Sequence, residues 1–170
     1  MGRNRVFFLP YLMGERSPIN DTDARGTFTG LSMDTTRSDM TLAVMEGVAF
    51  ALRDCLEIAR GQGIEINSVR ATGGGAKSPL WCKVLANALN VRVDKINSEE
   101  GPGYGAAILA AVGCGVFGSV AEAADKFISV VSSIEPETEL VKAYEKRYQV
   151  FKSIYPALKD VYEGICSCEE

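Results

Sequence analysis

The sequence predicts an α/β domain, and two observations support this prediction. Stretches with the three- and four-residue apolar spacing of helices alternate with short runs rich in β-branched residues, and glycine-rich turns separate them. The chain has 170 residues, of which 46% are hydrophobic and 24% charged, so it is long enough to bury a core. We therefore expect residues 1–170 to form a single domain.

The composition argues against several classes of function. The 18 lysines and arginines are scattered and the net charge is −4, which argues against binding to nucleic acid. The mean hydropathy of +0.04, without a long uncharged apolar run, argues against a membrane protein. Because the sequence has no histidine, Ser-His-Asp and Cys-His catalytic systems and His-ligated metal sites are excluded. The five cysteines form no C-x-x-C pair, which favours a cytoplasmic protein with reduced thiols.

The first 31 residues are predicted to contain little regular structure. Apolar residues 6–12 precede a polar, turn-rich stretch at 14–23, and the sequence GTFTGL at 26–31 predicts a short strand between glycines. Pro10 interrupts the apolar run, so the run does not predict a signal peptide. We expect residues 6–12 to be partly exposed or to be buried in a self-association contact.

Two long segments have the apolar spacing of amphipathic helices. A helix is predicted at residues 38–60, with Ser38 as its N-cap and Gly61 or Gly63 at its end. The tail is predicted to form two helices separated by Pro156, because a proline inside a helix removes a backbone hydrogen bond. The aromatic and apolar residues of the tail stripe indicate packing rather than ligand binding: Leu140, Tyr144, Tyr148, Phe151, Tyr155, Leu158 and Tyr162.

The glycines at 73–75 are the strongest local signal for a binding site. They follow a predicted strand at 68–72 and precede a predicted helix that runs from Ser78 or Pro79 to residue 89. Glycines there let the backbone approach a ligand and adopt positive φ, and the helix start offers N–H groups to an anion or a purine edge. The segment is not a Walker A loop, because both required glycines are alanines here. A plain tight turn is the alternative to a nucleotide site.

A second strand–loop–helix unit contains a formal dinucleotide fingerprint. A strand is predicted at 91–96 and a helix of small residues at 104–113, and the sequence GPGYGA at 101–106 fits G-x-G-x-x-A between them. Glu99 and Glu100 precede it, and their charges would repel a pyrophosphate. We interpret the segment as a loop whose small residues allow close helix packing. A Rossmann oxidoreductase is the alternative.

A charged cluster lies in the turn-rich stretch near the N-terminus. It consists of Glu15, Arg16, Asp21, Asp23 and Arg25. Such clusters are usually solvated surfaces with weak ion pairs, but arginine also suits phosphoryl and carboxylate groups in an ordered catalytic loop. The spacing leaves both interpretations open.

Several motifs stand together in the order found in one known family. The chain resembles the C-terminal part of the FGGY family of carbohydrate kinases, and its first segment resembles the xylulokinases of that family. The motifs are FLPYLMGERSP at 8–18, NDTDARG at 20–26, GTFTGL at 26–31, Asp39 to Glu46, the glycine run with Ser78 and Trp81, and Glu100 with GAA at 105–107.

The resemblance implies an actin-like, ribonuclease-H-like lobe that binds ATP with Mg²⁺ and closes with a second lobe over a sugar. On the family pattern, the expected nucleotide-binding residues are Gly73, Gly74, Gly75 and Ser78, with Gly74 and Gly75 against the base and ribose. Ser78 stands where relatives often carry the longer Asn, which puts its direct contact in question. Lys77 would lie at the rim of the site rather than on the phosphates.

The resemblance also implies that the catalytic base, an Asp, and the sugar pocket lie in an N-terminal lobe that precedes this chain. We therefore expect the ATP-binding part of a cytoplasmic kinase that converts D-xylulose to xylulose 5-phosphate. This chain would then hold no catalytic residue and no metal ligand, and it would be inactive alone. Another FGGY kinase, such as a gluconate kinase, and a non-catalytic truncated module are the alternatives. A homodimer is the expected assembly.

Overall fold

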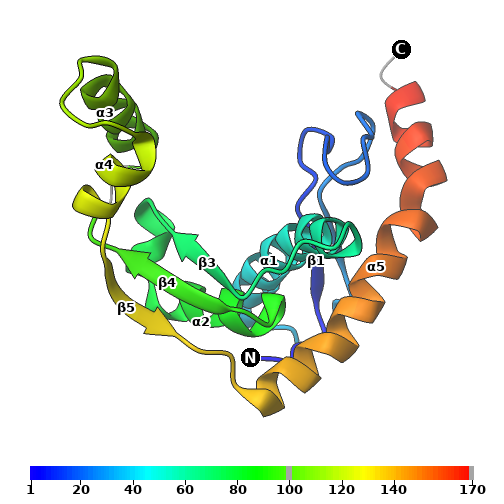
Figure 1. The fold of residues 1–170 in the computed structure, drawn as a ribbon. Coiled ribbons are helices and arrows are strands. Elements are labelled where there is room, and N and C mark those ends of the chain that lie inside the picture. The colour runs from blue at the N-terminus through cyan, green and yellow to red at the C-terminus, as the bar shows by residue number, and fades with distance from the viewer. Residues whose placement is uncertain (99–100, 169–170) are drawn as a thin grey trace.

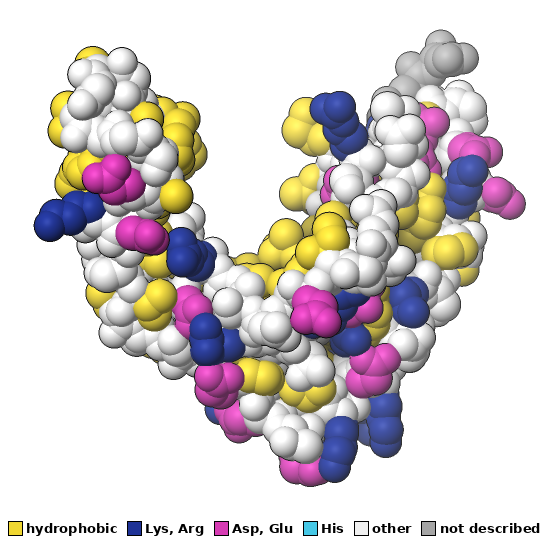
Figure 2. Space-filling view, viewed as in Figure 1, with side chains coloured by type: hydrophobic (Ala, Val, Ile, Leu, Met, Phe, Trp, Pro, Cys, Tyr) yellow, Lys and Arg dark blue, Asp and Glu magenta, His cyan; other side chains and the backbone are white. Residues whose placement is uncertain are grey.

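The computed structural model describes residues 1–98 and 101–168, and its elements form a base with two arms (Figure 1). The first arm consists of α3 and α4, and the second consists of α5 and the loop of residues 11–25. Figure 2 shows the hollow between the arms, with hydrophobic side chains on part of its floor. In chain order the elements are β1 (Phe7–Leu9), β2 (Thr27–Thr29), α1 (Arg37–Gly61), β3 (Ser68–Ala71), the 3₁₀ turn η1 (Gly74–Lys77), α2 (Pro79–Leu89), β4 (Arg92–Ile96), α3 (Gly101–Gly113), α4 (Val120–Phe127), β5 (Val130–Ile134) and α5 (Thr138–Ser167).

Two small sheets organise the base. In the larger sheet, β4 lies between β3 and β5, and it runs parallel to β3 and antiparallel to β5. The register places Ala71 of β3 opposite Lys95 of β4. In the smaller sheet, β1 and β2 pair antiparallel. Because parallel strands end at the same edge, β3 and β4 deliver their following loops to one place.

Helix α1 is fixed at its start by a capping box. The Thr36 hydroxyl accepts a hydrogen bond from the Asp39 N–H, and the Asp39 carboxylate accepts one from the Thr36 N–H. The prediction of Ser38 as the N-cap is therefore wrong by two residues, because the carboxylate three residues after Thr36 completes the box. The predicted body of the helix, residues 38–60, is confirmed.

Helix α1 contacts β1 through Gly47. A Cβ atom at Gly47 would overlap the carbonyl oxygen of Phe8 in β1. The absence of a side chain therefore lets the helix and strand backbones approach closely. This contact buries most of the first apolar segment, including Val6, Leu9 and Tyr11, which are at most 2% exposed. The expectation that residues 6–12 are partly exposed is therefore wrong for the buried residues, but it holds at Phe7 and Pro10, which are half-buried, and at Leu12, which is 68% exposed.

Helix α5 is continuous, so the predicted break at Pro156 is wrong. A proline inside a helix costs roughly 3 kcal/mol. Buried aromatic residues lie on both sides of the proline: Tyr144, Tyr148 and Phe151 before it and Tyr162 after it. The packing of these rings against the base and the loop of residues 11–25 keeps both halves of α5 on one helix axis. This packing outweighs the hydrogen bond that is lost at Pro156.

The other secondary-structure predictions are partly confirmed and partly wrong. The strands at 68–71 and 92–96 and the helix at 79–89 lie where the sequence predicts them, within one residue. Helix α3 begins at Gly101, so the predicted loop at 101–103 is its first turn instead. Helix α4 and strand β5 were not predicted. In the part of the chain that the structure describes, no helix combines the length and apolar character that crossing a membrane requires.

Gly47→Ala tests the close contact between α1 and β1. Replacing Gly47 by Ala places a methyl group against a main-chain oxygen that cannot rotate away, so we expect a destabilisation of about 3 kcal/mol. The matched control is Gly61→Ala at the end of the same helix, where no described atom lies within 4 Å of an added Cβ. That variant should be at least as stable as wild type, by up to about 1 kcal/mol, because alanine has the higher helix propensity. Urea unfolding followed by circular dichroism measures both, and equal midpoints would contradict the proposed packing.

Candidate functional site

The glycine turn lies directly after β3. Gly73 adopts φ +76° and ψ −172°, a conformation that residues with side chains rarely occupy. One turn of 3₁₀ helix follows, with Ala76 N–H donating to the Gly73 carbonyl at 3.1 Å and Ser78 N–H donating to the Gly75 carbonyl at 3.1 Å. The sequence allows a positive φ at each of the three glycines at 73–75, but only Gly73 adopts one.

Gly74 and Gly75 differ in the space around them. An added Cβ at Gly74 would meet no described atom within 4 Å, so this position faces open space. An added Cβ at Gly75 would lie 3.1 Å from both Cδ1 and Nε1 of Trp81. A side chain at Gly75 would therefore disturb the packing of Trp81 as well as any ligand, whereas a side chain at Gly74 would fill only the open space.

Ser78 caps helix α2. Its hydroxyl oxygen accepts a hydrogen bond from the Trp81 N–H at 3.2 Å, and its carbonyl accepts one from Cys82 N–H at 3.1 Å. The Ser78 side chain thus satisfies one of the donors at the helix start. Its hydroxyl hydrogen can still donate to a ligand beside the turn.

A cavity of about 320 Å³ lies between the glycine turn and the ends of β4 and β5. Gly73, Ala76 and Lys77 line one side, and Lys95 and Asn97 line the other. Two lysines at one cavity favour an anionic group. Lys95 was not predicted as a site residue, because its place here depends on the strand register that sets it opposite Ala71.

Asn97 fixes the far wall of this cavity. Its side-chain N–H donates to the Phe127 carbonyl at 2.9 Å, and its side-chain oxygen accepts from Ser129 N–H at 3.1 Å. The main-chain N–H of Asn97 donates to the Ser129 carbonyl at 3.0 Å. These bonds tie the end of β4 to the segment between α4 and β5, so the wall is set by the fold.

The dinucleotide fingerprint at 101–106 forms the first turns of α3 rather than a tight turn after a strand. An added Cβ at Gly101 would lie 3.3 Å from the Thr72 hydroxyl oxygen, so the start of α3 approaches the residue before the glycine turn. The segment is therefore a helix and not a loop, and the predicted close packing of its small residues is wrong, because Ala106 and Ala107 are exposed and an added Cβ at Gly105 would meet no described atom within 4 Å. Glu99 and Glu100 lie outside the described residues.

The charged cluster near the N-terminus orders its own loop. Glu15 and Asp21 exchange two main-chain hydrogen bonds of 2.8 Å. The Asp21 carboxylate accepts from the Tyr155 hydroxyl at 2.5 Å, which lowers the pKa of Asp21 and raises the pKa of Tyr155 to about 12. Arg25 donates to the Thr22 carbonyl at 2.8 Å and contacts the Cys166 sulfur at 3.3 Å.

These contacts attach the loop of residues 11–25 to α5. Arg16 is exposed at the surface of the loop, and Asp23 contributes its main-chain N–H to the Asp21 carboxylate at 2.8 Å. Of the two interpretations left open by the spacing, these contacts favour an ordered loop over a solvated surface. No group of three Cys, Asp or Glu side chains in residues 1–98 and 101–168 is arranged to hold a metal ion.

The known proteins that this chain is similar to are carbohydrate kinases. The FGGY family of carbohydrate kinases, C-terminal domain, matches residues 2–114. A xylulose kinase from Staphylococcus epidermidis is 42% identical over 161 residues, covering 95% of this chain and 32% of that protein. A solved structure titled as a xyloylose kinase from Brucella ovis has a TM-score of 0.85 and 40% identity, covering 95% of this chain and 33% of the other.

A gluconate kinase structure from Lactobacillus acidophilus also matches, with a TM-score of 0.85 and 30% identity over 96% of this chain and 33% of that one. The chain thus spans about a third of the length of the relatives it matches. The predicted α/β fold of the actin-like, ribonuclease-H-like type is confirmed by these matches. On the family match and the glycine turn together, the chain belongs to the FGGY family of carbohydrate kinases and corresponds to its C-terminal domain.

Proposed function

We propose that residues 1–170 form the nucleotide-binding lobe of a two-lobed kinase that transfers the γ-phosphate of ATP to D-xylulose. The observation that carries the proposal is the glycine turn, which lies where β3 and β4 end together in a chain of this family. The identity of up to 42% with xylulose kinases favours xylulose as the sugar. The cytoplasmic location and the homodimer expected from the sequence belong to the same proposal.

In this proposal the glycine turn contacts the base and ribose of ATP. Gly74 leaves the space that the nucleotide needs, and Gly73 sets the direction of the turn. The Ser78 hydroxyl lies at the start of α2, within the same segment. Lys95 of the neighbouring cavity favours the anionic part of the nucleotide, and Lys77 keeps the place at the rim that the family pattern implies.

Phosphoryl transfer needs positioning and charge neutralisation more than covalent participation by the protein. One lobe can therefore hold the nucleotide while another supplies the base and the sugar pocket. Mg²⁺ accompanies the phosphates in this proposal. Since the described residues offer no set of three carboxylates for a metal, we assign it no ligand in this chain.

Gluconate is the alternative sugar. The gluconate kinase structure matches the fold as well as the xyloylose kinase structure does, with TM-scores of 0.85 for both. The sequence identity is lower, at 30% against 40%, which favours xylulose. The fold of this lobe alone therefore does not select the sugar, whereas the sequence similarity favours xylulose.

Gly74→Val tests the nucleotide site. The added side chain would fill the open space at the turn without meeting a described atom at its Cβ, so we expect at least a tenfold loss of ATP affinity, an order-of-magnitude estimate. Ligand-detected NMR suits the measurement, because wild-type affinity is expected near millimolar, about −4 kcal/mol. Gly75→Val should also lose binding, but it disturbs Trp81 as well.

The control for this test is Gly103→Ala, in the fingerprint segment on α3. It should bind ATP as wild type does, because we place the nucleotide on the glycine turn and not on the start of α3. Thermal unfolding of each variant confirms that the lobe is folded. Loss of ATP signals in Gly103→Ala, with Gly74→Val unaffected, would move the site to the fingerprint segment.

The proposal also predicts that this chain has no turnover alone. It spans about a third of the relatives' length, and the base and sugar pocket are proposed to lie in the rest. A coupled assay of ADP release should therefore show no dependence on added xylulose. Xylulose-dependent turnover by the purified chain would show that the catalytic base lies within these residues.

A further inference from the structure

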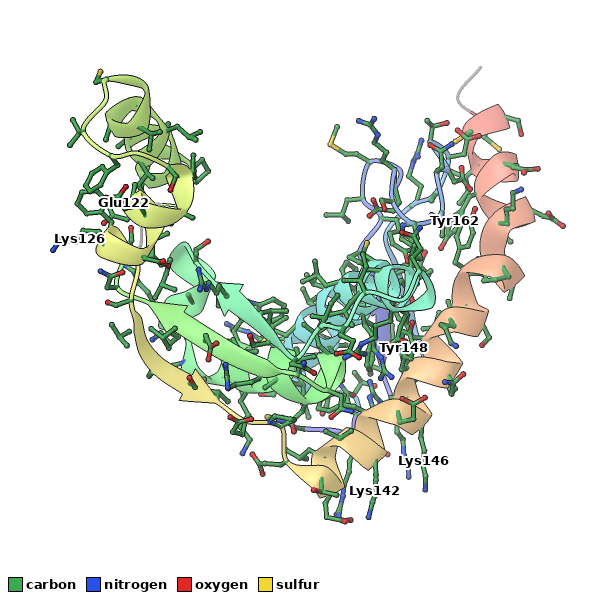
Figure 3. All side chains as sticks on the ribbon, viewed as in Figure 1. Glu122, Lys126, Lys142, Lys146, Tyr148 and Tyr162 are labelled. Carbon is green, nitrogen blue, oxygen red and sulfur yellow. The ribbon has the colours of Figure 1, made fainter. Side chains whose placement is uncertain are left out.

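Helix α3 is apolar on every side. Neither α3 nor the segment that follows it carries a charge, because residues 101–121 contain no Asp, Glu, Lys or Arg. Figure 3 labels Glu122 and Lys126, which are charged residues of α4 on the same arm. A helix that is apolar all round is normally enclosed by other elements, whereas a surface helix has one polar face. We therefore expect both sides of α3 to be covered in the assembled protein.

One stripe of α3 is buried or half-buried in this chain. It consists of Tyr104, Ile108 and Val112, which recur every four residues along the helix. Helix α3 packs mainly on α4, and the Tyr104 hydroxyl donates a hydrogen bond of 3.1 Å to the Phe127 carbonyl at the end of α4. The arm itself therefore covers one side of the helix.

The opposite stripe of α3 is open. Ala106, Leu109, Ala110 and Gly113 follow one another at three- and four-residue steps, and all four are exposed, Leu109 by 59%. Val116, in the segment after the helix, is 66% exposed. Figure 2 shows hydrophobic side chains gathered over this arm. Exposed apolar surface that is contiguous in this way is typical of a protein contact.

The composition of α3 also calls for a partner on the open stripe. Four of its 13 residues are glycines, which favour a helix least of all residues except proline. A helix of this length is marginal in water unless packing of an apolar face stabilises it. Ile108 is the one buried residue among the 13, all of which the structure describes, so α4 supplies little of that packing.

The relatives indicate which partner covers the open stripe. The family match is to a C-terminal domain, and the chain covers 32% of the Staphylococcus epidermidis xylulose kinase, so about two thirds of that protein precedes the matched region. A lobe joined to this chain reaches the stripe at a high effective concentration, which favours it over a second copy. A membrane surface attracts helices with basic residues beside the apolar face, and residues 101–121 have none.

We propose that the preceding lobe of the kinase packs an apolar surface on the open stripe of α3, with Leu109 as the largest side chain of the contact. This inference rests on the two-lobed kinase of the proposed function. Helix α3 begins beside the glycine turn, because an added Cβ at Gly101 would lie 3.3 Å from the Thr72 hydroxyl oxygen. The contact would therefore hold the preceding lobe close to the element that we propose for the nucleotide.

Hydrogen–deuterium exchange of the α3 amides tests the proposal. Residues 1–170 are measured alone and in a fusion in which the N-terminal two thirds of the Staphylococcus epidermidis xylulose kinase precede them. We expect the α3 amides to exchange at least about tenfold more slowly in the fusion, because a covered helix opens less often. Leu109→Glu should bring exchange in the fusion back close to that of the chain alone. Glutamate forms helices as well as leucine does, but its charge does not fit an apolar contact.

Leu52→Glu is the matched control, because Leu52 is 47% exposed and lies on α1. It should leave the slow exchange of α3 in the fusion unchanged. Equal exchange of α3 in the chain alone and in a fusion that turns over xylulose would overturn the inference while the proposed function stands. Slow exchange in a fusion without turnover would support the inference and count against the proposed function. Unchanged slow exchange in Leu109→Glu would also overturn the inference.

Two further outcomes concern the partner. If exchange of α3 in the chain alone slows as the chain concentration rises, a second copy covers the stripe and the inference is overturned. If the fusion does not fold, the natural Staphylococcus epidermidis enzyme is measured in its place. Its segment that matches residues 101–113 should then exchange slowly, and exchange there as fast as in the chain alone would overturn the inference.

Discussion

The buried ion pair between Glu46 and Arg147 holds the base and the second arm together. Arg147 donates to the Glu46 carboxylate at 2.7 Å and to the Val6 carbonyl at 3.1 Å, and its guanidinium lies 4.3 Å from the centroid of the Phe7 ring. Glu46 is 1% exposed and Arg147 is 7% exposed. Removing one partner of such a pair leaves an uncompensated buried charge, which costs about 3–5 kcal/mol. The relative positions of β1, α1 and α5 therefore depend on this contact.

The motifs that carry the family resemblance serve the same assembly. Asp39 completes the capping box of α1, and Glu46 forms the buried pair. Gly30 has φ +79°, and a Cβ there would overlap the Arg5 carbonyl oxygen, so β2 needs glycine at its end. None of these three residues lines the cavity beside the glycine turn. The signature thus marks how the first strands dock on α1, and the glycine turn, where we propose the nucleotide to bind, depends on it through the packing of α1 against α2.

Local sequence signals predicted the elements whose causes are local. Helix α2 follows from its Ser78 cap, the proline in its first turn and its apolar run, and the structure confirms it. The unpredicted strand β5 is exposed at four of its five residues, so it lacks the alternation that predicts a strand with one buried face. The buried face of α1 includes Glu46 and Arg53, which apolar spacing does not reveal, because their partners Arg147 and Glu145 lie about a hundred residues away.

The candidate site also contains both features with a local cause and features that depend on long-range packing. The glycine turn was predicted because glycines between a strand and a helix have a local cause. The position of Lys95 was not, because strand register depends on long-range pairing that a single sequence does not reveal. The place of Asp54 beside aromatic residues likewise depends on how α5 and the loop of residues 11–25 pack on α1.

The glycine turn is ordered by the fold before any ligand arrives. Behind it, α2 buries seven residues between the sheet and α1, and the Ser78 cap fixes the first turn of that helix. The conformation of Gly73 and the two hydrogen bonds of η1 define the path of the backbone from β3 into α2. Binding at the turn would therefore need little reordering of the backbone, and the affinity of this lobe for a nucleotide would depend on the number of contacts it offers. In the proposed kinase, a lobe built in this way would hold the nucleotide in a set direction while a second lobe moves against it, and phosphoryl transfer between two bound substrates requires this division of roles.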